Sequence, residues 1–152
     1  WRCSAARGRQ APGVTALTSD LERLGASVRV LEVDTTDAER LRTVLDQLRS
    51  ERPLAGVVHA AGLLDDAIVP NMTPGQLHLV LASKVDSALN LDAATREDDL
   101  RFFTVFSSLY GVLGGPGQAN YAAANTFLDH FAHWRRAQGR PANSVAWGLW
   151  DE

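Results

Sequence analysis

Two polar side chains stand four residues apart in a run of very small residues, Ala119-Asn-Tyr-Ala-Ala-Ala-Asn125. Tyr121 and Asn125 share one face of a predicted helix, because side chains at positions i and i+4 lie one above the other. The small neighbours leave room for another molecule to lie against this face. A half-buried aromatic anchor is the alternative role for Tyr121.

Lys84 is a charged residue at an apolar position of its predicted helix. Its neighbours on that face are Leu81, Val85 and Ala88. A charge at such a position is costly unless it has a partner or a task. The alternative is a lysine whose amine reaches solvent beyond its apolar stem.

Apolar periodicity predicts helices that alternate with strands, and these elements must position the polar residues. Helices are expected over 13–24, from Asp37 to before Pro53, from Thr73 to about 89, and over 118–137; strands are expected over 27–33, 54–60, 102–106 and 144–147. This alternation predicts an α/β fold with right-handed crossovers and a parallel sheet covered on both faces.

Ligands bind such sheets at the carboxyl ends of the strands, so the residues that follow each strand are candidates for function. They are Asp34, Ala60-Ala-Gly62, Ser107-Ser108 and Trp147-Gly-Leu-Trp150. The turn at 60–62 lets a flat ligand approach the backbone closely, although glycine also serves ordinary turns. His59, just before it, is interpreted as a satisfied histidine at a strand end.

Composition excludes several classes of function. Fifteen Lys and Arg against eighteen Asp and Glu, interspersed, form no basic stripe, so we expect no nucleic-acid partner. No apolar run approaches the ~18 residues of a membrane span, and no leader is recognisable, so we expect no membrane association. The single cysteine, Cys3, favours a reducing, cytoplasmic location. His130 and His133 lack a third ligand, so no metal site is expected.

Both ends of the chain are expected to be truncated. No strand with a glycine-rich turn is predicted before residue 13, although such a sheet normally opens with one. The chain also stops directly after its last strand, at Trp150-Asp-Glu152. The sequence therefore predicts one partial catalytic domain over residues 1–152.

The polar residues and their spacing together resemble a known family. Ser108 follows Lys84 by 24 residues, Tyr121 comes 13 residues later, and Asn125 four residues after that. The last three of these lie in one string, Phe106-Ser-Ser-Leu-Tyr-Gly-Val-Leu-Gly-Gly-Pro-Gly-Gln-Ala-Asn-Tyr-Ala-Ala-Ala-Asn125. From about residue 12 to the end, the chain resembles the ketoreductase domain of modular polyketide synthases, a branch of the short-chain dehydrogenase/reductases. Further landmarks are His59-Ala-Ala-Gly-Leu-Leu-Asp-Asp66 and Ala146-Trp-Gly-Leu-Trp150. Most of the superfamily carries its lysine four residues after the tyrosine, where this chain has Asn125.

The resemblance implies a Rossmann-like, doubly wound parallel sheet and an NADPH-dependent reduction. The substrate would be a β-ketoacyl chain on an acyl carrier protein, and the partners would be other domains of the same megasynthase. Tyr121 would be the general acid, with a pKa lowered by the nearby Lys84 cation. Ser108 would hydrogen-bond the ketone oxygen, and Asn125 would hold the Lys84 amine or a water.

The same resemblance assigns residues to cofactor and substrate. Arg7, Asp34, Ala60, Ala61 and Gly62 would line the cofactor groove together with Lys84 and Tyr121; Leu64, Asp65, Asp66, Leu113, Gln118 and Trp147 would direct the substrate. The chain reads Ala5-Ala-Arg-Gly8 where the family usually has Ser-Arg-Arg-Gly, so only Arg7 matches its 2′-phosphate residues. Leu-Asp-Asp at 64–66, and Leu113 in place of a tryptophan, mark the B-type, which forms D-β-hydroxyl products.

Two alternatives of other classes stay open. One is a structural, non-reducing remnant of a ketoreductase, kept for its contacts within a megasynthase. The other is a free-standing short-chain dehydrogenase acting on a small alcohol. Animal fatty acid synthases contain a similar reductase and are the relatives most easily confused with this family.

Overall fold

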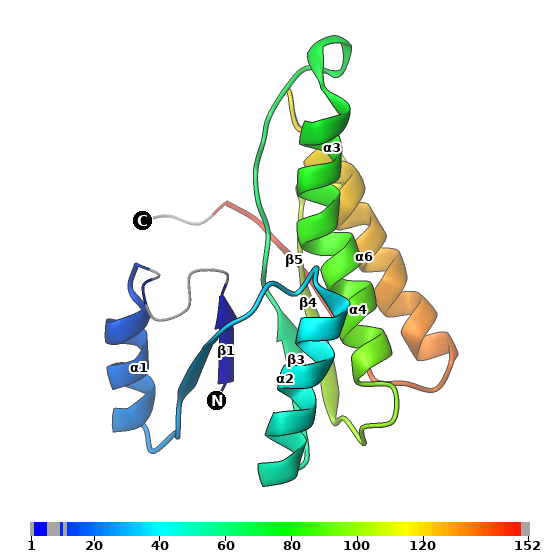
Figure 1. The fold of residues 1–152 in the computed structure, drawn as a ribbon. Helices are drawn as coiled ribbons and strands as arrows, with labels where there is room; N and C mark the ends of the chain where they lie inside the picture. The colour runs from blue at the N-terminus through cyan, green and yellow to red at the C-terminus, as the bar shows by residue number, and fades with distance from the viewer. Residues whose placement is uncertain (1, 6–9, 11, 150–152) are drawn as a thin grey trace.

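The computed structural model describes residues 2–5, 10 and 12–149, and strands alternate with helices along the described chain (Figure 1). The strands are β1 (Arg2–Ala5), β2 (Arg29–Glu32), β3 (Gly56–His59), β4 (Phe102–Ser108) and β5 (Asn143–Trp147). The helices are α1 (Val14–Arg23), α2 (Ala38–Glu51), α3 (Pro74–Leu81), α4 (Ser87–Ala94), α5 (Tyr110–Leu113) and α6 (Ala119–Ala137). A 3-10 turn, η2 (Val69–Asn71), precedes α3, and a π-helical turn, η3 (Ala82–Asp86), joins α3 to α4.

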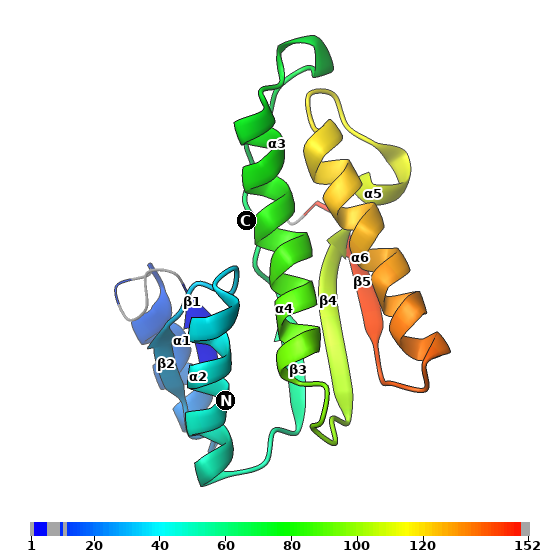
Figure 2. The ribbon, with the colours of Figure 1, turned by 45° about the vertical axis from the view of Figure 1, so that its right-hand side comes forward.

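All the strand pairs are parallel, as predicted, and they form two sheets. β1 pairs with β2, and the second sheet has the order β3-β4-β5. α1 and α2 lie on opposite sides of the two-stranded sheet, and α4 and α6 pack against the three-stranded one (Figure 1 and Figure 2). The parallel pairs and the helical crossovers confirm the predicted α/β class.

Local signals in the sequence set the helix boundaries. The Asp37 carboxylate accepts the Arg40 backbone N–H and caps α2. Thr73 and Gln76 form a reciprocal capping box at the start of α3, with Pro74 in the first turn. Gly25, with φ +83°, follows α1 in the left-handed conformation that a helix C-terminus favours.

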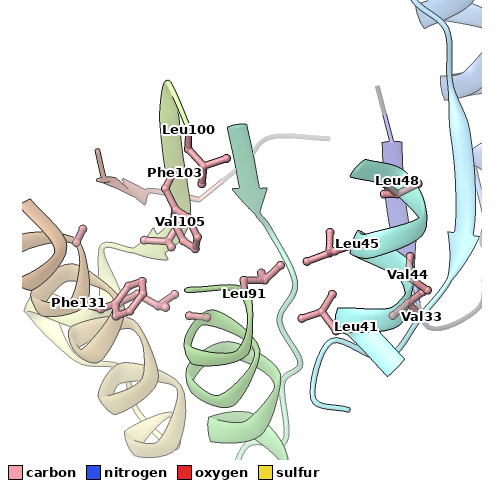
Figure 3. Close-up of a cluster of buried hydrophobic side chains, with 13 residues drawn as sticks. Val33, Leu41, Val44, Leu45, Leu48, Leu91, Leu100, Phe103, Val105 and Phe131 are labelled. Carbon is pink, nitrogen blue, oxygen red and sulfur yellow. The ribbon is translucent and has the colours of Figure 1, made fainter. Parts of the chain in front are cut away.

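One apolar core joins the two sheets through α2. Leu41 and Leu45 of α2 point toward Leu91 of α4 (Figure 3). Phe103 of β4 is fully buried and meets Phe131 of α6 edge-on, with ring centroids 5.9 Å apart. Burial of these side chains is the main force that holds the helices to the sheets.

A buried cluster of charges ties α4 to the C-terminal end of α6. Asp92 of α4 accepts hydrogen bonds from Arg135 and from Arg140, the latter at 2.6 Å. Asp92 and Arg135 are each almost completely buried, and the Arg135 guanidinium carbon lies 4.0 Å from the centroid of the Phe103 ring. Removing one partner of such a cluster would leave a buried charge without compensation.

The start of the chain corrects the sequence prediction, which placed no strand before residue 13. The backbone of Arg2–Ala5 forms β1 and pairs in register with Arg29–Glu32. Four residues of mixed type carry too little apolar periodicity to be recognised, and pairing with β2 makes the strand. The predicted sheet also differs in extent, because β1 and β3 are not hydrogen-bonded to each other.

Among the described residues, no helix combines the length and the apolar character that crossing a lipid bilayer requires.

The outer edge of β3 is expected to pair with a second copy of the chain. β3 is an edge strand, and its Val58 side chain is 47% exposed. Unpaired apolar edges pair with other chains, so residues 1–152 expressed alone should self-associate, and Val58→Lys should shift them toward monomer. Size-exclusion chromatography with light scattering measures this. Val112→Lys, at an exposed apolar site outside the strands, is the control, and a monomeric, cooperatively melting wild-type chain would contradict the prediction.

Candidate active site

Lys84 lies in the π turn η3, where the helix carries it into the interior. The residue is only 4% exposed, and its Nζ donates a 2.9 Å hydrogen bond to the Phe106 carbonyl of β4. Nζ also lies 5.4 Å from the centroid of the Tyr121 ring. Burial lowers the pKa of Lys84 from 10.5 to about 8, although Asp129 of α6 acts in the opposite direction. The amine is thus mostly protonated at neutral pH.

The close approach of the chain at Gly62 completes the surroundings of this amine. A Cβ atom at position 62 would lie 3.0 Å from Cε of Lys84 and 3.3 Å from its Nζ. The exposed segment after β3 therefore passes directly beside the charged group, and a larger residue there would displace it. The turn at 60–62 and Lys84, which the sequence analysis named separately, are therefore neighbours in the structure.

Tyr121 and Asn125 lie on one face of α6, as predicted. Tyr121 is half-buried, whereas Asn125 is fully buried. Asn125 Nδ2 donates to the Tyr121 carbonyl at 2.8 Å, and its Oδ1 is buried without a hydrogen-bond partner among the described residues. A buried acceptor of this kind is suited to an amine or a water molecule.

Ser108 closes β4, two residues beyond the predicted end of that strand. Its Oγ accepts the Tyr110 backbone N–H at 3.2 Å, so the hydroxyl hydrogen is left to donate elsewhere. Helix α5 then packs onto α6 at Gly111, where a Cβ atom would lie 3.0 Å from the Thr126 nitrogen. Thr126 Oγ1 donates to the Gly111 carbonyl at 2.6 Å, which fixes Ser108 relative to the helix of Tyr121.

The Leu64-Asp65-Asp66 segment is fastened to the beginnings of two helices. Gln118 donates to the Asp66 carboxylate and Gln76 to the Asp65 carboxylate, each at 2.9 Å. Buried Asn120 donates to the Asp65 carbonyl at 2.8 Å. These bonds place the segment beside the start of α6, one turn from Tyr121. Sequence reasoning named Gln118 but missed Gln76 and Asn120, because no local pattern in the sequence links either residue to the 64–66 segment.

Leu113 and Trp147 lie on the exposed side of the same region. Leu113, at the end of α5, is 72% exposed, whereas Trp147 of β5 is partly covered. The Trp147 ring packs 5.4 Å from that of Phe106, and its carbonyl accepts the Leu109 N–H at 2.9 Å. Ser108 and Trp147 are also register partners in the sheet.

The predicted cofactor residues follow the carboxyl ends of β2 and β3. Ala60, Ala61 and Gly62 are exposed, and none has a side chain larger than a methyl group. Asp34 follows β2, and its Oδ1 accepts the backbone N–H and the hydroxyl of Thr36. This small-residue surface beside the Lys84 amine fits a flat nucleotide cofactor. Arg7 lies outside the described residues.

His59 is a contact of Lys84 that sequence reasoning did not connect to the site. The ring is 3% exposed, and its Nε2 lies 3.0 Å from the Lys84 carbonyl oxygen. The sequence interpretation of a satisfied histidine at the strand end agrees with this burial. The partner could not be foreseen, because it lies 25 residues further along the chain.

The family model and similar curated proteins all point to polyketide synthases. A family model described as KR domain matches residues 3–152. Mycoketide-CoA synthase of Mycobacterium tuberculosis (strain ATCC 25618 / H37Rv) is 49% identical over 146 residues, which are 96% of this chain and 4% of that protein. Polyketide synthase GfsA of Streptomyces halstedii is 50% identical over 146 residues, 96% of this chain and 2% of that protein. The chain thus spans a small fraction of these relatives.

Solved structures agree in fold. The structure described as "Structure of A-type Ketoreductases from Modular Polyketide Synthase" superimposes with a TM-score of 0.95 at 42% identity, covering 99% of this chain and 32% of that one. The first ketoreductase of the tylosin PKS superimposes with a TM-score of 0.88 at 39% identity, covering 99% and 33%.

Burial of the Lys84 charge makes a prediction about stability. Lys84→Met should raise the free energy of unfolding at pH 7 by about 1 to 3 kcal/mol, because a desolvated charge is replaced by an apolar chain. Between about pH 8 and 10.5 the unfolded wild-type chain binds more protons than the folded one, so wild-type stability rises with pH and the gain shrinks. Denaturant titrations of both proteins across this range measure the difference; a gain independent of pH would contradict it.

Proposed function

The chain belongs to the ketoreductase (KR) domain family of modular polyketide synthases, and we propose that it reduces a β-ketoacyl thioester to a β-hydroxyacyl thioester with NADPH. The observation that carries this proposal is the buried Lys84 amine, 5.4 Å from the centre of the half-buried Tyr121 ring. A lysine held at this cost beside a phenol is suited to proton transfer.

Tyr121 delivers the proton to the ketone oxygen. An ordinary phenol has a pKa near 10 and is a poor proton carrier at neutral pH, but a cation nearby favours the phenolate that remains after transfer. Lys84 supplies this charge without leaving the interior, because the Phe106 carbonyl accepts its hydrogen bond. The amine stays mostly protonated below about pH 8.

Ser108 stabilises the negative charge that develops on the ketone oxygen. Its Oγ already accepts the Tyr110 N–H, so its own hydrogen can donate to the substrate. A donor aimed at developing charge in a dry site commonly contributes about 3 kcal/mol to transition-state stabilisation. The contact of Gly111 with α6 keeps this donor in place relative to Tyr121.

Asn125 completes the proton path. Its buried Oδ1, which accepts no hydrogen bond from the described part of the chain, is an acceptor for the Lys84 amine or for a water that relays protons. Its Nδ2 is occupied by the Tyr121 carbonyl, which fixes the orientation of the amide. Asn125 would therefore act on Lys84 and on Tyr121 from the same helix.

NADPH would be held along Asp34, Ala60, Ala61 and Gly62, with Arg7 on its 2′-phosphate. When bound, the cofactor supplies the hydride for the reduction. The chain contributes an open backbone surface after β3 and the exposed Asp34 carboxylate after β2. Thr35, next to Asp34, donates to Ser87 Oγ at 2.8 Å and so links this surface to the helix of Lys84.

The substrate would arrive on an acyl carrier protein, and the other partners would be further domains of the same synthase. The support is that the relatives are polyketide synthases of which this chain covers only a few per cent. A cytoplasmic location, predicted from the cysteine content, belongs to the same proposal.

Replacing the phenol tests the reaction directly. In the full-length protein, Tyr121→Phe should lower ketone reduction by 10² to 10⁴ while NADPH affinity changes less than about threefold, because the phenol acts on the proton. Steady-state rates with a diketide thioester and a cofactor-fluorescence titration measure the two effects. Tyr110→Phe is the matched control. A Tyr121→Phe variant that kept more than about a tenth of the rate would show that another group is the acid.

The segment at 64–66 predicts the configuration of the product. Its bonds to Gln118, Gln76 and Asn120 hold it beside the start of α6, so it can block one of the two entrances to Tyr121. We expect a D-configured β-hydroxyl, and Ala123, in place of the proline of epimerising B-type domains, favours no inversion of an α-substituent. Chiral chromatography of the diketide product decides this; Asp65→Ala should erode the selectivity and Glu97→Ala should not. A predominantly L-configured alcohol would contradict the prediction.

A further inference from the structure

His59 holds the backbone of the residue that carries the buried amine. Its Nε2 lies 3.0 Å from the Lys84 carbonyl oxygen. Because a carbonyl oxygen only accepts hydrogen bonds, Nε2 must carry a hydrogen and donate it. Burial also lowers the pKa of His59 below its ordinary value of 6.5, so the ring is neutral at pH 7. The one N–H of this ring is therefore spent on the Lys84 backbone and is not available to a substrate.

The carbonyl that His59 binds belongs to the π turn. Such turns insert one extra residue into a helix and disturb its ladder of backbone hydrogen bonds. Here the Ser87 N–H is directed at the carbonyls of both Ala82 and Lys84. A donor from a neighbouring strand therefore supports the helix at the point where its own bonding is irregular.

We propose that His59 is a positioning residue for Lys84: its hydrogen bond fixes the π turn and thereby keeps the Lys84 amine between the Phe106 carbonyl and the Tyr121 ring. A lysine side chain is long and flexible, so one hydrogen bond at its tip does not determine where the amine lies. Hydrogen bonds at both the backbone and the amine of Lys84 together fix the position of the amine. The consequence for catalysis rests on the proposed function, whereas the restraint itself does not.

Release of the backbone restraint has a predictable result. The turn can relax, and the amine can then extend toward solvent, as exposed lysines do. The burial that depresses its pKa would be lost, and the pKa of Lys84 would rise from about 8 toward 10.5. The other charged group that acts on the amine, Asp129 of α6, is unchanged in every variant of position 59.

The experiment measures the position of the amine without substrate or cofactor. Lys84 is the only lysine among residues 1–152, and the signal that disappears from the ¹³Cε-lysine spectrum of the labelled full-length protein in Lys84→Met is assigned to it. We expect a pKa near 8 in the wild type and in His59→Gln, whose Nε2 replaces that of the imidazole. His59→Leu lacks the donor and should raise the value by at least one pH unit. His130→Leu, which removes an exposed histidine bound to the Thr126 carbonyl, should leave it unchanged.

His59→Asn covers the case in which the leucine variant does not fold. The shorter amide keeps a polar group in the pocket but does not reach the carbonyl, so it should behave like leucine. An unchanged Lys84 titration in whichever of these two variants folds would overturn the proposal. So would a glutamine variant that titrates like the leucine variant.

A second measurement separates positioning from a general loss of structure. His59→Leu should lower kcat about tenfold or more with a smaller change in KM, but should cause no further loss in a Lys84→Met background. Equal losses in both backgrounds would overturn the proposal. If the wild type reduced no thioester while its Lys84 titration still followed position 59, the proposed function would fail and the positioning role would stand. If Tyr121→Phe abolished reduction but substitutions of His59 changed neither the Lys84 titration nor the rate, the proposed function would stand and the positioning role would fail.

Discussion

The charge of Lys84 is the constraint around which this structure is arranged. An ammonium group that is almost completely buried requires a hydrogen-bond acceptor, a fixed backbone and neighbours that leave room for it. Phe106 of β4, and His59 and Gly62 at the end of β3, meet these three needs from two segments of the chain. Strands β3 and β4 therefore do more than form a sheet, because their ends deliver the groups that make the buried charge tolerable.

The parts of the fold that the sequence predicted are those determined by neighbouring residues. Asp37 and Thr73 mark helix starts and Gly25 marks a helix end through interactions that span only a few residues. The strands at 102–106 and 144–147 were recognisable from short apolar runs, and the structure extends each by one or two residues. The spacing of Lys84, Ser108, Tyr121 and Asn125 could be read as one site only through resemblance to a family.

Features that depend on distant segments escaped prediction. One continuous helix was expected from Thr73 to about 89, whereas the structure has the π turn at Ala82–Asp86 and continues as α4 to Ala94. Nothing in the residues at 82–86 signals this turn, since its support comes from His59, 25 residues earlier. β1 was missed for the same reason, because its partner is β2 and not its own neighbours.

The charge cluster at Asp92 gives the two helices of the site a common pivot. Lys84 and Asp92 are eight residues apart, about 12 Å along the helix axis, whereas Tyr121 and Arg135 are fourteen residues apart, about 21 Å along α6. The cluster joins α4 and α6 below the site, and the Phe103–Phe131 contact separately holds α6 to β4. The amine and the phenol therefore stand on two helices that one buried charge cluster ties together, so a shift of one helix is passed to the other.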